Sequence, residues 1–151
     1  MKILTIENKK EEKFLREKTK NFDFAKSKRK DIQDLIKMMN RFMVDAGGIG
    51  LSANQVGMDF RVFIARVNRK FYAIFNPEIT KYSKETVNAQ EGCLSLPDVL
   101  GYVLRPEKVT LEGYDKNGKK IKIKAWGVLA RVFQHEVDHL NGKLFIDRIK
   151  K

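Results

Sequence analysis

The sequence has one cysteine and two histidines among its 151 residues. The lone Cys93 cannot form an internal disulfide, which excludes the class of small secreted domains held together by disulfides. A closed structural zinc site usually takes four protein ligands, and the cysteine and the two histidines supply three at most. Any place where these three scarce residues come together is therefore informative.

Proline and long apolar runs are also scarce. Three prolines exclude collagen-like and proline-rich architectures, and no stretch approaches the roughly 20 apolar residues that a membrane helix needs. The start, Met1–Ile6, lacks the apolar core and cleavage site of a secretory signal. We therefore expect a cytoplasmic protein with no membrane partner.

Apolar residues make up 42% of the chain, enough for one folded domain over residues 1–151. The 31 basic residues exceed the 19 acidic ones, so the net charge is +12, which attracts acidic partners such as a ribosome surface. The lysine-rich segment from Glu7 to Lys30 is one candidate for a transient ribosome contact. Basic residues are mixed with acids, and no RNA motif interleaved with aromatic residues is visible. We therefore expect no direct sequence-specific nucleic-acid binding.

Apolar spacing predicts two main helices. Residues at three- and four-residue steps indicate an amphipathic helix from Asp31 to Asp45, with Ser27 or Asp31 as its start signal. The same spacing predicts a helix from about Gly127 to Leu140. The charged segment from Glu7 to Lys30 is expected to be part helix and part loop.

Short β-favouring runs predict two hairpins. The first pairs residues 61–65 with 71–75 and ends at Asn76-Pro77. The second pairs residues 108–114 with 119–124 around the turn sequence Asp115-Lys116-Asn117-Gly118. The predicted structure therefore combines helices with antiparallel strands.

Both histidines lie in the sequence His135-Glu136-Val137-Asp138-His139, an H-E-x-x-H pattern on a predicted helix. Four residues turn a helix by about 400°, which puts the two imidazoles on one face about 6 Å apart, with Glu136 beside them. This arrangement is typical of metal binding. Two ordinary surface histidines are the alternative.

A third metal ligand must come from elsewhere in the chain. The third-histidine position of one group of zinc proteases is occupied by Phe145, and Asp147 is the only acid in the tail. Cys93 is the natural candidate, because a thiolate is a strong ligand for Fe(II) or Zn(II). Cys93 lies in Glu91–Pro97, where a glycine and a proline predict an irregular backbone. The alternative role of Cys93 is that of a small buried core residue.

A glycine-rich segment spans residues 47–57. Its glycines do not follow the G-x-G-x-x-G order and come after a helix, which argues against a nucleotide loop. They permit close backbone approach to a ligand, and Gln55 offers an amide donor for a developing oxyanion. A plain loop that ends the helix is the alternative.

In this order, Gly48–Gln55, Glu91–Ser95 and Gln134–Leu140 resemble the motifs of the peptide deformylase family, and the likeness spans about residues 47–148. The resemblance implies an α+β fold, with antiparallel strands packed around a central metal-binding helix and an N-terminal amphipathic helix. It also implies removal of the formyl group from N-formylmethionine of nascent polypeptides, with release of formate.

The resemblance further implies roles for individual residues. The implied metal ligands are Cys93, His135 and His139. Metal-bound hydroxide attacks the formyl carbonyl with Glu136 as general base and acid, while Gln55 and the backbone N–H of Leu94 stabilise the oxyanion. The implied substrate-binding residues are Ile49, Gly50, Leu94 and Val132. For Ile49, Leu94 and Val132, core packing is the alternative role. The implied metal is Fe(II), with Zn(II), Ni(II) or Co(II) as alternatives.

Two departures from the family pattern stand out. Ser52 replaces the usual alanine, a change that we expect to add one hydrogen bond and to leave the mechanism unaltered. The arginine often found shortly after the cysteine motif is missing, and Arg105 comes later, so the grip on the substrate backbone stays open. Two other functions also stay open: a non-catalytic module associated with the ribosome or RNA and built on structural zinc, and a different H-E-x-x-H metallohydrolase.

Overall fold

The structure, a computed structural model, describes residues 2–149 as an α+β protein. The helices are α1 (Lys9–Leu15), α2 (Arg29–Asp45) and α3 (Gly127–Leu140). The strands are β1 (Gly50–Ser52), β2 (Val62–Val67), β3 (Lys70–Tyr82), β4 (Thr86–Cys93), β5 (Leu96–Pro106), β6 (Lys108–Tyr114) and β7 (Lys120–Trp126). Short 3-10 helices span Phe24–Lys26, Ala53–Val56 and Phe145–Arg148. No helix among these residues is long and apolar enough to cross a membrane.

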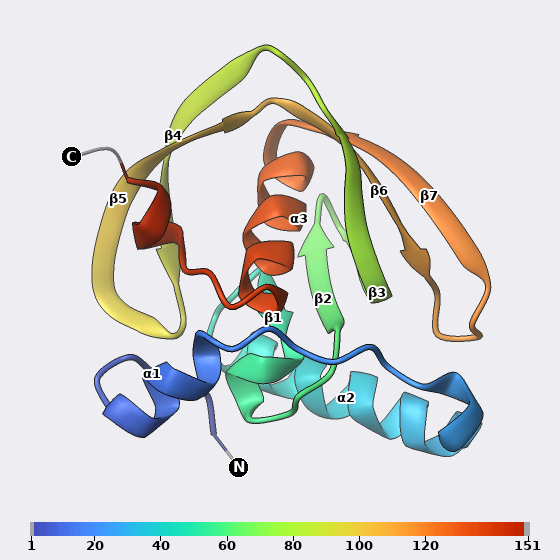
Figure 1. Cartoon of the computed structure of the whole chain (residues 1–151). Coiled ribbons are helices and arrows are strands. Elements are labelled where there is room, and N and C mark those ends of the chain that lie inside the picture. The colour runs from blue at the N-terminus through green and yellow to red at the C-terminus, as the bar shows by residue number, and fades with distance from the viewer. Residues whose placement is uncertain (1, 150–151) are drawn as a thin grey trace.

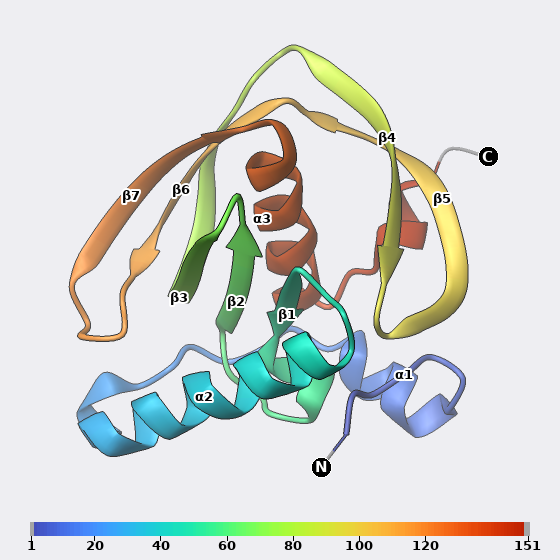
Figure 2. The ribbon, with the colours of Figure 1, turned by 180° about the vertical axis from the view of Figure 1, so that it is seen from behind.

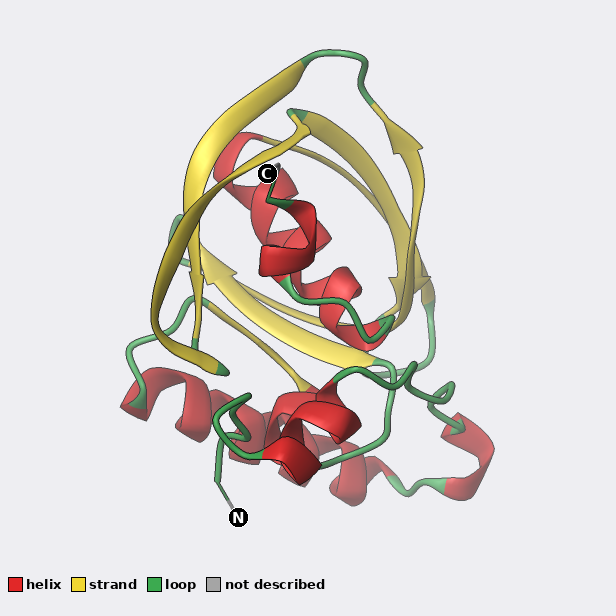
Figure 3. Ribbon diagram, turned by 60° about the vertical axis from the view of Figure 1, so that its left-hand side comes forward, coloured by secondary structure: helices red, strands yellow, loops and turns green. Residues whose placement is uncertain are grey.

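The strands form two antiparallel sheets. One has five strands in the order β1-β2-β3-β6-β7, and the other is the two-stranded β4–β5 hairpin. Figure 1 shows the two sheets on opposite sides of α3, with α2 running beneath β1 and β2. Figure 3, coloured by secondary structure, shows the same strands around the central helix. This confirms the predicted fold, in which antiparallel strands surround the helix that carries both histidines.

Two apolar cores hold the helices against the larger sheet. Phe133 of α3 packs edge-on against Phe63 and Tyr72, with ring centroids 5.7 and 5.4 Å apart. On the other side, α2 buries an apolar stripe against β1 and β2, namely Ile32, Leu35, Met39 and Met43. Burying a side chain of this kind contributes roughly 1.5–3 kcal/mol to stability, so these methionines act as core residues.

The helix predictions are confirmed with small shifts. α3 spans Gly127–Leu140 as predicted. α2 starts at Arg29, two residues before the predicted Asp31. The Asp31 carboxylate accepts a hydrogen bond from the backbone N–H of Lys28 at 3.1 Å. Asp31 therefore stabilises the start of the helix from inside its first turn, and Ser27 is not the cap.

The first hairpin ends where predicted, because its β2–β3 pairing stops at Val62 and Phe75, but its second strand continues. β3 runs past Asn76-Pro77 to Tyr82, with a register shift between Phe75 and Glu78 where Asn76 takes a φ of 49°. A proline has no N–H for the ladder, but a bulge tolerates it because the pairing is locally interrupted there. The turn signal therefore marks a bulge inside a long strand.

The irregular backbone expected over Glu91–Pro97 is confined to a register shift before Cys93 and the turn at Leu94-Ser95. Residues 86–93 form β4 and pair with β5, with a register shift between Gly92 and Cys93 that leaves the cysteine at the strand end. In β4 only Glu91 is buried, so the strand has no apolar alternation to reveal it. Backbone pairing, the contacts of the buried Glu91 carboxylate, and packing of Leu96 and Val103 of β5 against Leu144 and Phe145 hold the hairpin.

Candidate active site

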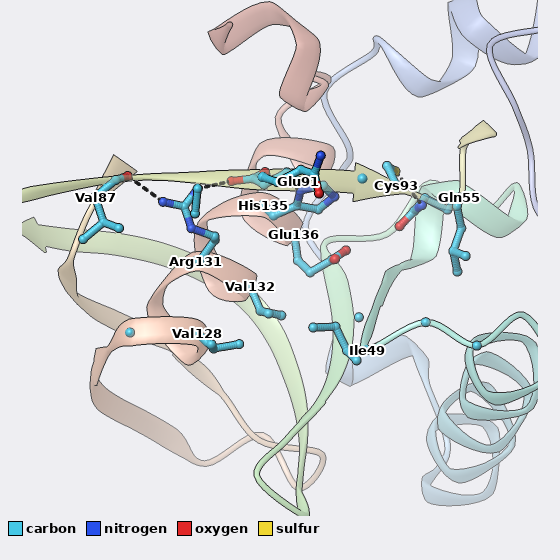
Figure 4. Close-up of a pocket in the computed structure, with 18 of the residues that line it drawn as sticks. Ile49, Gln55, Val87, Glu91, Cys93, Val128, Arg131, Val132, His135 and Glu136 are labelled. Atoms are coloured by element: carbon cyan, nitrogen blue, oxygen red, sulfur yellow. Dashed lines mark hydrogen bonds and ion pairs between the residues drawn. The ribbon is translucent and has the colours of Figure 1, made fainter. Parts of the chain in front are cut away.

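Three potential metal ligands from two distant elements converge. His135 and His139 lie one turn apart on α3, and Cys93 ends β4. The His139 Nε2 atom is 3.1 Å from the Cys93 Sγ atom and 3.2 Å from the His135 Nε2 atom. All three donor atoms lie within 4.8 Å of one another, and Figure 4 shows His135 and Cys93 on the same wall of a cavity.

The donor set fits a divalent metal. One sulfur and two imidazole nitrogens suit Fe(II) or Zn(II), and three protein ligands are typical of catalytic sites. Among the described residues this cluster holds three donors, so the closed four-ligand zinc site lacks its fourth. The structure thus contains a possible Cys/His metal site, at the residues singled out from the sequence.

Glu91 sets the orientation of one ligand. Its Oε1 atom lies 2.9 Å from the His135 Nδ1 atom, which leaves the His135 Nε2 atom directed toward Cys93 and His139. A carboxylate in this position fixes the ring and makes it a better metal ligand. Sequence analysis missed this role, although Glu91 stands in the cysteine motif.

The pKa values favour ionised groups in this cluster. Burial opposes the Cys93 thiolate, but the adjacent His139 and His135 lower its pKa to about 6. Burial also opposes protonation of His135, but hydrogen bonds with Cys93 and Glu91 raise its pKa to about 10. The thiolate, which is the form that binds metal, is therefore favoured at neutral pH, and a metal ion held here would have to displace the proton from His135.

A network of buried charges lies behind the ligands. The Glu91 carboxylate accepts hydrogen bonds from Arg105 at 2.6 and 3.0 Å and from Arg131 at 2.6 Å. Asp138 accepts from the Arg105 Nη1 atom at 2.9 Å and from Arg148 at 2.6 and 2.7 Å. Burial opposes ionisation of Glu91. The hydrogen bonds and positive charges of His135 and Arg105 outweigh this effect and lower its pKa to about 2.

Arg105 is fully committed to this network. Its side chain is 3% exposed and binds two carboxylates, so it does not reach a substrate in the cavity. The late arginine noted in the sequence therefore does not replace the missing one. Its role is to hold β5 to β4 and to α3.

Glu136 is buried beside the ligands and has two close neighbours on β1. Ser52 donates a hydrogen bond through its Oγ atom to Glu136 Oε1 at 2.8 Å. A Cβ atom added to Gly50 would lie 2.6 Å from Glu136 Oε2, so any larger residue would displace the carboxylate. The hydrogen bond that Ser52 was expected to add is therefore present, and its acceptor is the Glu136 carboxylate.

Gln55 is held with its amide directed toward the cluster. Its Oε1 atom accepts a hydrogen bond from the Ser52 backbone N–H at 2.9 Å. Its Nε2 atom donates to Ser95 Oγ at 3.1 Å and lies 3.6 Å from Cys93 Sγ. The carbonyl side is thus occupied, and the N–H side is presented to the metal cluster.

A cavity of about 790 Å³ opens over these groups. Of the residues predicted for the site, those that line it are Ile49, Gly50, Gln55, Cys93, Leu94, Val132, His135 and Glu136. His139 lies behind them and is 1% exposed. The cavity also contacts residues that sequence analysis missed, including Val87, Ala89, Val128 and Arg131 (Figure 4). Val128, Arg131 and Val132 share a face of α3 with His135, so helical spacing from the histidine could have revealed them.

Comparison with known proteins identifies the family. The chain matches the family model described as polypeptide deformylase over residues 1–151. This chain belongs to the polypeptide deformylase family. It is 48% identical over 118 residues to a peptide deformylase of Treponema pallidum (strain Nichols), an alignment that covers 78% of this chain and 73% of that protein.

Solved structures agree. The fold matches a crystal structure of peptide deformylase from Thermotoga maritima with a TM-score of 0.90 and 34% identity, covering 99% of this chain and 97% of that one. A probable peptide deformylase from Synechococcus phage S-SSM7 matches with a TM-score of 0.88 and 40% identity, covering 99% of both chains. This chain is accordingly a metal-dependent hydrolase of protein biosynthesis that removes the N-formyl group from nascent polypeptides.

Proposed function

We propose that Cys93, His135 and His139 hold a divalent ion in this enzyme, with Fe(II) favoured over Zn(II), Ni(II) and Co(II). The observation that carries the proposal is the convergence of one sulfur and two nitrogens beside Glu136, at the wall of an apolar-lined cavity. A bound ion of this kind supplies Lewis acidity, which lowers the pKa of a water and polarises a carbonyl.

Glu136 is the general base and acid of the proposal. Its carboxylate takes a proton from the water that attacks the formyl carbon, and it delivers that proton to the amine as the C–N bond breaks. Formate and a free amino terminus are the products. The hydrogen bond from Ser52 and the close approach of Gly50 keep the carboxylate in one orientation during both transfers.

Gln55 and the backbone N–H of Leu94 are the proposed oxyanion donors. The Gln55 amide is prevented from turning by its bonds to Ser52 and Ser95, so the donor is in place before charge develops. Preorganised donors stabilise a transition state without reorganisation, and loss of one typically costs ~10²–10³ in rate. Leu94 lines the same cavity.

Two free strand edges offer a grip on the peptide without an arginine. Within residues 2–149, β1 is the last strand of its sheet and β4 pairs only with β5, so each has an edge without a partner strand. Gly50 of β1 and residues 89–92 of β4 line the same cavity. An extended substrate lying between these edges can form backbone hydrogen bonds with them. Ile49, Val128 and Val132 then provide apolar contacts for a methionine side chain.

The choice of substrate tests the proposed activity directly. The enzyme should release formate from formyl-Met-Ala-Ser, whereas acetyl-Met-Ala-Ser and unmodified Met-Ala-Ser should not be cleaved. The three peptides share the Met-Ala-Ser sequence, so the group on the amino terminus alone decides whether a peptide is cleaved. Cleavage of the unmodified peptide would instead indicate a different H-E-x-x-H metallohydrolase. Formate production and peptide masses, measured on parallel samples, distinguish these results.

Arg131 is a proposed positioning residue. Its Nη1 atom donates to Glu91 at 2.6 Å and to Val103 O at 3.0 Å, and its Nη2 atom donates to Val87 O at 2.7 Å. These bonds tie α3 to both strands of the β4–β5 hairpin, as Figure 4 shows for Val87 and Glu91. The substrate-facing edge of β4 is thus held at a set distance from the metal cluster.

Arg131→Met should therefore raise KM for formyl-Met-Ala-Ser about tenfold with a smaller effect on kcat, because the hydrogen bonds that place β4 are lost. Arg131→Lys should recover only part of the loss, since it lacks the planar fork. Arg16→Met, which breaks a surface pair with Asp147, is the matched control and should leave KM unchanged. A folded Arg131→Met enzyme with normal KM would contradict the assignment.

The substrate also bears on location and partners. Formylated nascent chains emerge from ribosomes, which supports a cytoplasmic site of action and a transient ribosome contact. The net charge of +12 favours such a contact. In the lysine-rich segment from Glu7 to Lys30, however, Arg16 and Lys20 already pair with carboxylates, so the charge of the segment is partly neutralised.

A further inference from the structure

We propose that the solvent face of β6 and β7 binds the phosphate backbone of RNA without reading its sequence. Lys120, Lys122, Lys124 and Trp126 occupy alternate positions of β7, and all are exposed. This inference does not depend on the deformylase chemistry. It gives the proposed ribosome contact a defined surface, which differs from the lysine-rich start.

The fold places these four side chains on one face. Between them lie Ile121, Ile123 and Ala125, which pack into the core under α3. Because successive side chains of a strand point to opposite faces, the three lysines and the tryptophan all point outward. Along one face they recur about every 6.8 Å, a spacing similar to that of successive phosphates in an extended RNA strand.

The strand is also accessible. β7 is the last strand of the five-stranded sheet and pairs only with β6. Figure 2 shows it at the outer edge of the molecule, on the far side of the sheet from β1. A polyanion can therefore lie along β7 without meeting another element of the described chain.

The charge of this face is largely uncompensated. The residues of β6 paired with the stripe are Lys108, Thr110, Glu112 and Tyr114, of which Thr110 is buried. Glu112 is the one acid among them, and it lies 3.9 Å from the Lys120 Nζ atom. Within the described residues Lys122 and Lys124 have no carboxylate within 4.0 Å. Although Glu112 lies opposite Lys122 and near Lys120, the lysines of this face outnumber it. The excess positive charge attracts phosphates, and the counterions released on contact favour binding.

Trp126 distinguishes RNA from other acidic partners. Its side chain is 69% exposed at the end of the lysine row, where an indole can stack on an unpaired base. An anionic membrane would require a broader apolar cluster, whereas Trp126 and Tyr114 are the large exposed apolar residues on this face. The next residues, Gly127 and Val128, line the active-site cavity. RNA bound along β7 would therefore end beside the cavity where the nascent chain enters.

The test compares two triple variants with equal net charge. Lys120→Gln/Lys122→Gln/Lys124→Gln removes the stripe, and Lys9→Gln/Lys10→Gln/Lys13→Gln removes three exposed lysines of α1. Binding of the intact protein to a fluorescent 20-nucleotide single-stranded RNA of mixed sequence is measured by anisotropy between about 50 and 300 mM KCl. Formate release from formyl-Met-Ala-Ser should be unchanged in both variants, because none of these lysines lines the cavity.

The stripe variant should bind at least tenfold more weakly at low salt. The slope of log K against log salt should become shallower by about 2, since three phosphate contacts contribute roughly 0.7 each. Trp126→Ala should weaken binding roughly tenfold with the slope unchanged. The α1 variant should change little in either measurement.

Three results would overturn the proposal. Equal losses in both triple variants would mean that net charge alone attracts RNA. No binding by the unaltered protein would mean that the lysines serve only to keep an exposed edge strand from pairing with another chain. Binding to vesicles of one part phosphatidylserine and three parts phosphatidylcholine, with none to RNA, would assign the face to membranes.

Discussion

Replacing Glu136 with Gln should lower kcat for formate release by roughly 10²–10⁴, the usual contribution of a positioned general base and acid. Glutamine keeps the shape of the side chain, and its carbonyl oxygen can still accept the hydrogen bond that Ser52 donates at 2.8 Å. It cannot take a proton from water or deliver one to the amine. The loss should therefore appear in kcat, while KM changes little.

Metal content and a second variant separate this explanation from damage to the site. Glu136→Gln should bind the same amount of metal as the unaltered enzyme, because the three ligands are intact. Ser52→Ala removes the hydrogen bond but keeps the carboxylate, so it should lose less than about tenfold in kcat. A fully metallated Glu136→Gln enzyme with normal formate release would refute the proposed role.

Replacing Cys93 with Ala should abolish both metal retention and activity. Only two imidazoles then remain, and the thiolate, whose pKa is lowered to about 6, no longer balances the charge of the ion. Two-ligand sites hold divalent ions weakly, since catalytic metal sites typically use three protein ligands. The fold should persist, because Cys93 lies at the end of β4 and the paired strands remain.

Elemental analysis after purification without oxygen tests both the ligand set and the proposed metal. The unaltered enzyme should contain about one equivalent of iron, and Cys93→Ala should contain almost none. Cys93→Ser, with a harder and less acidic donor, should retain less metal than the unaltered enzyme. Stoichiometric metal in Cys93→Ala would remove Cys93 from the ligand set, and stoichiometric zinc in the unaltered enzyme would replace iron in the proposal.

Local patterns predicted much of this protein because they depend on neighbours in the chain. Helical spacing located α3 from Gly127 to Leu140, and the positions of His135 and His139 within it put both rings on one face. The turn at Asp115–Gly118 located the hairpin of β6 and β7. The three motifs together indicated the family, which the family model and the relatives then confirmed.

Local patterns failed where backbone pairing or buried charge replaced apolar alternation. β4 carries a single buried residue, the carboxylate of Glu91, and therefore shows no strand pattern. The bulge at Asn76 resembles the end of a strand because the same residue types favour both. The sequence indicated that Ser52 adds a hydrogen bond but not its partner, because Glu136 lies 84 residues away in the chain.

The sequence by itself determined which side chains could do the chemistry: two imidazoles and a carboxylate on one helix, and the only thiol. The tertiary structure alone decided that Cys93 meets His139, 46 residues later, and that Glu91 and Arg131 hold the strand that carries it. Helical periodicity relates residues a few positions apart, whereas the approach of two distant segments depends on the packing of the whole chain.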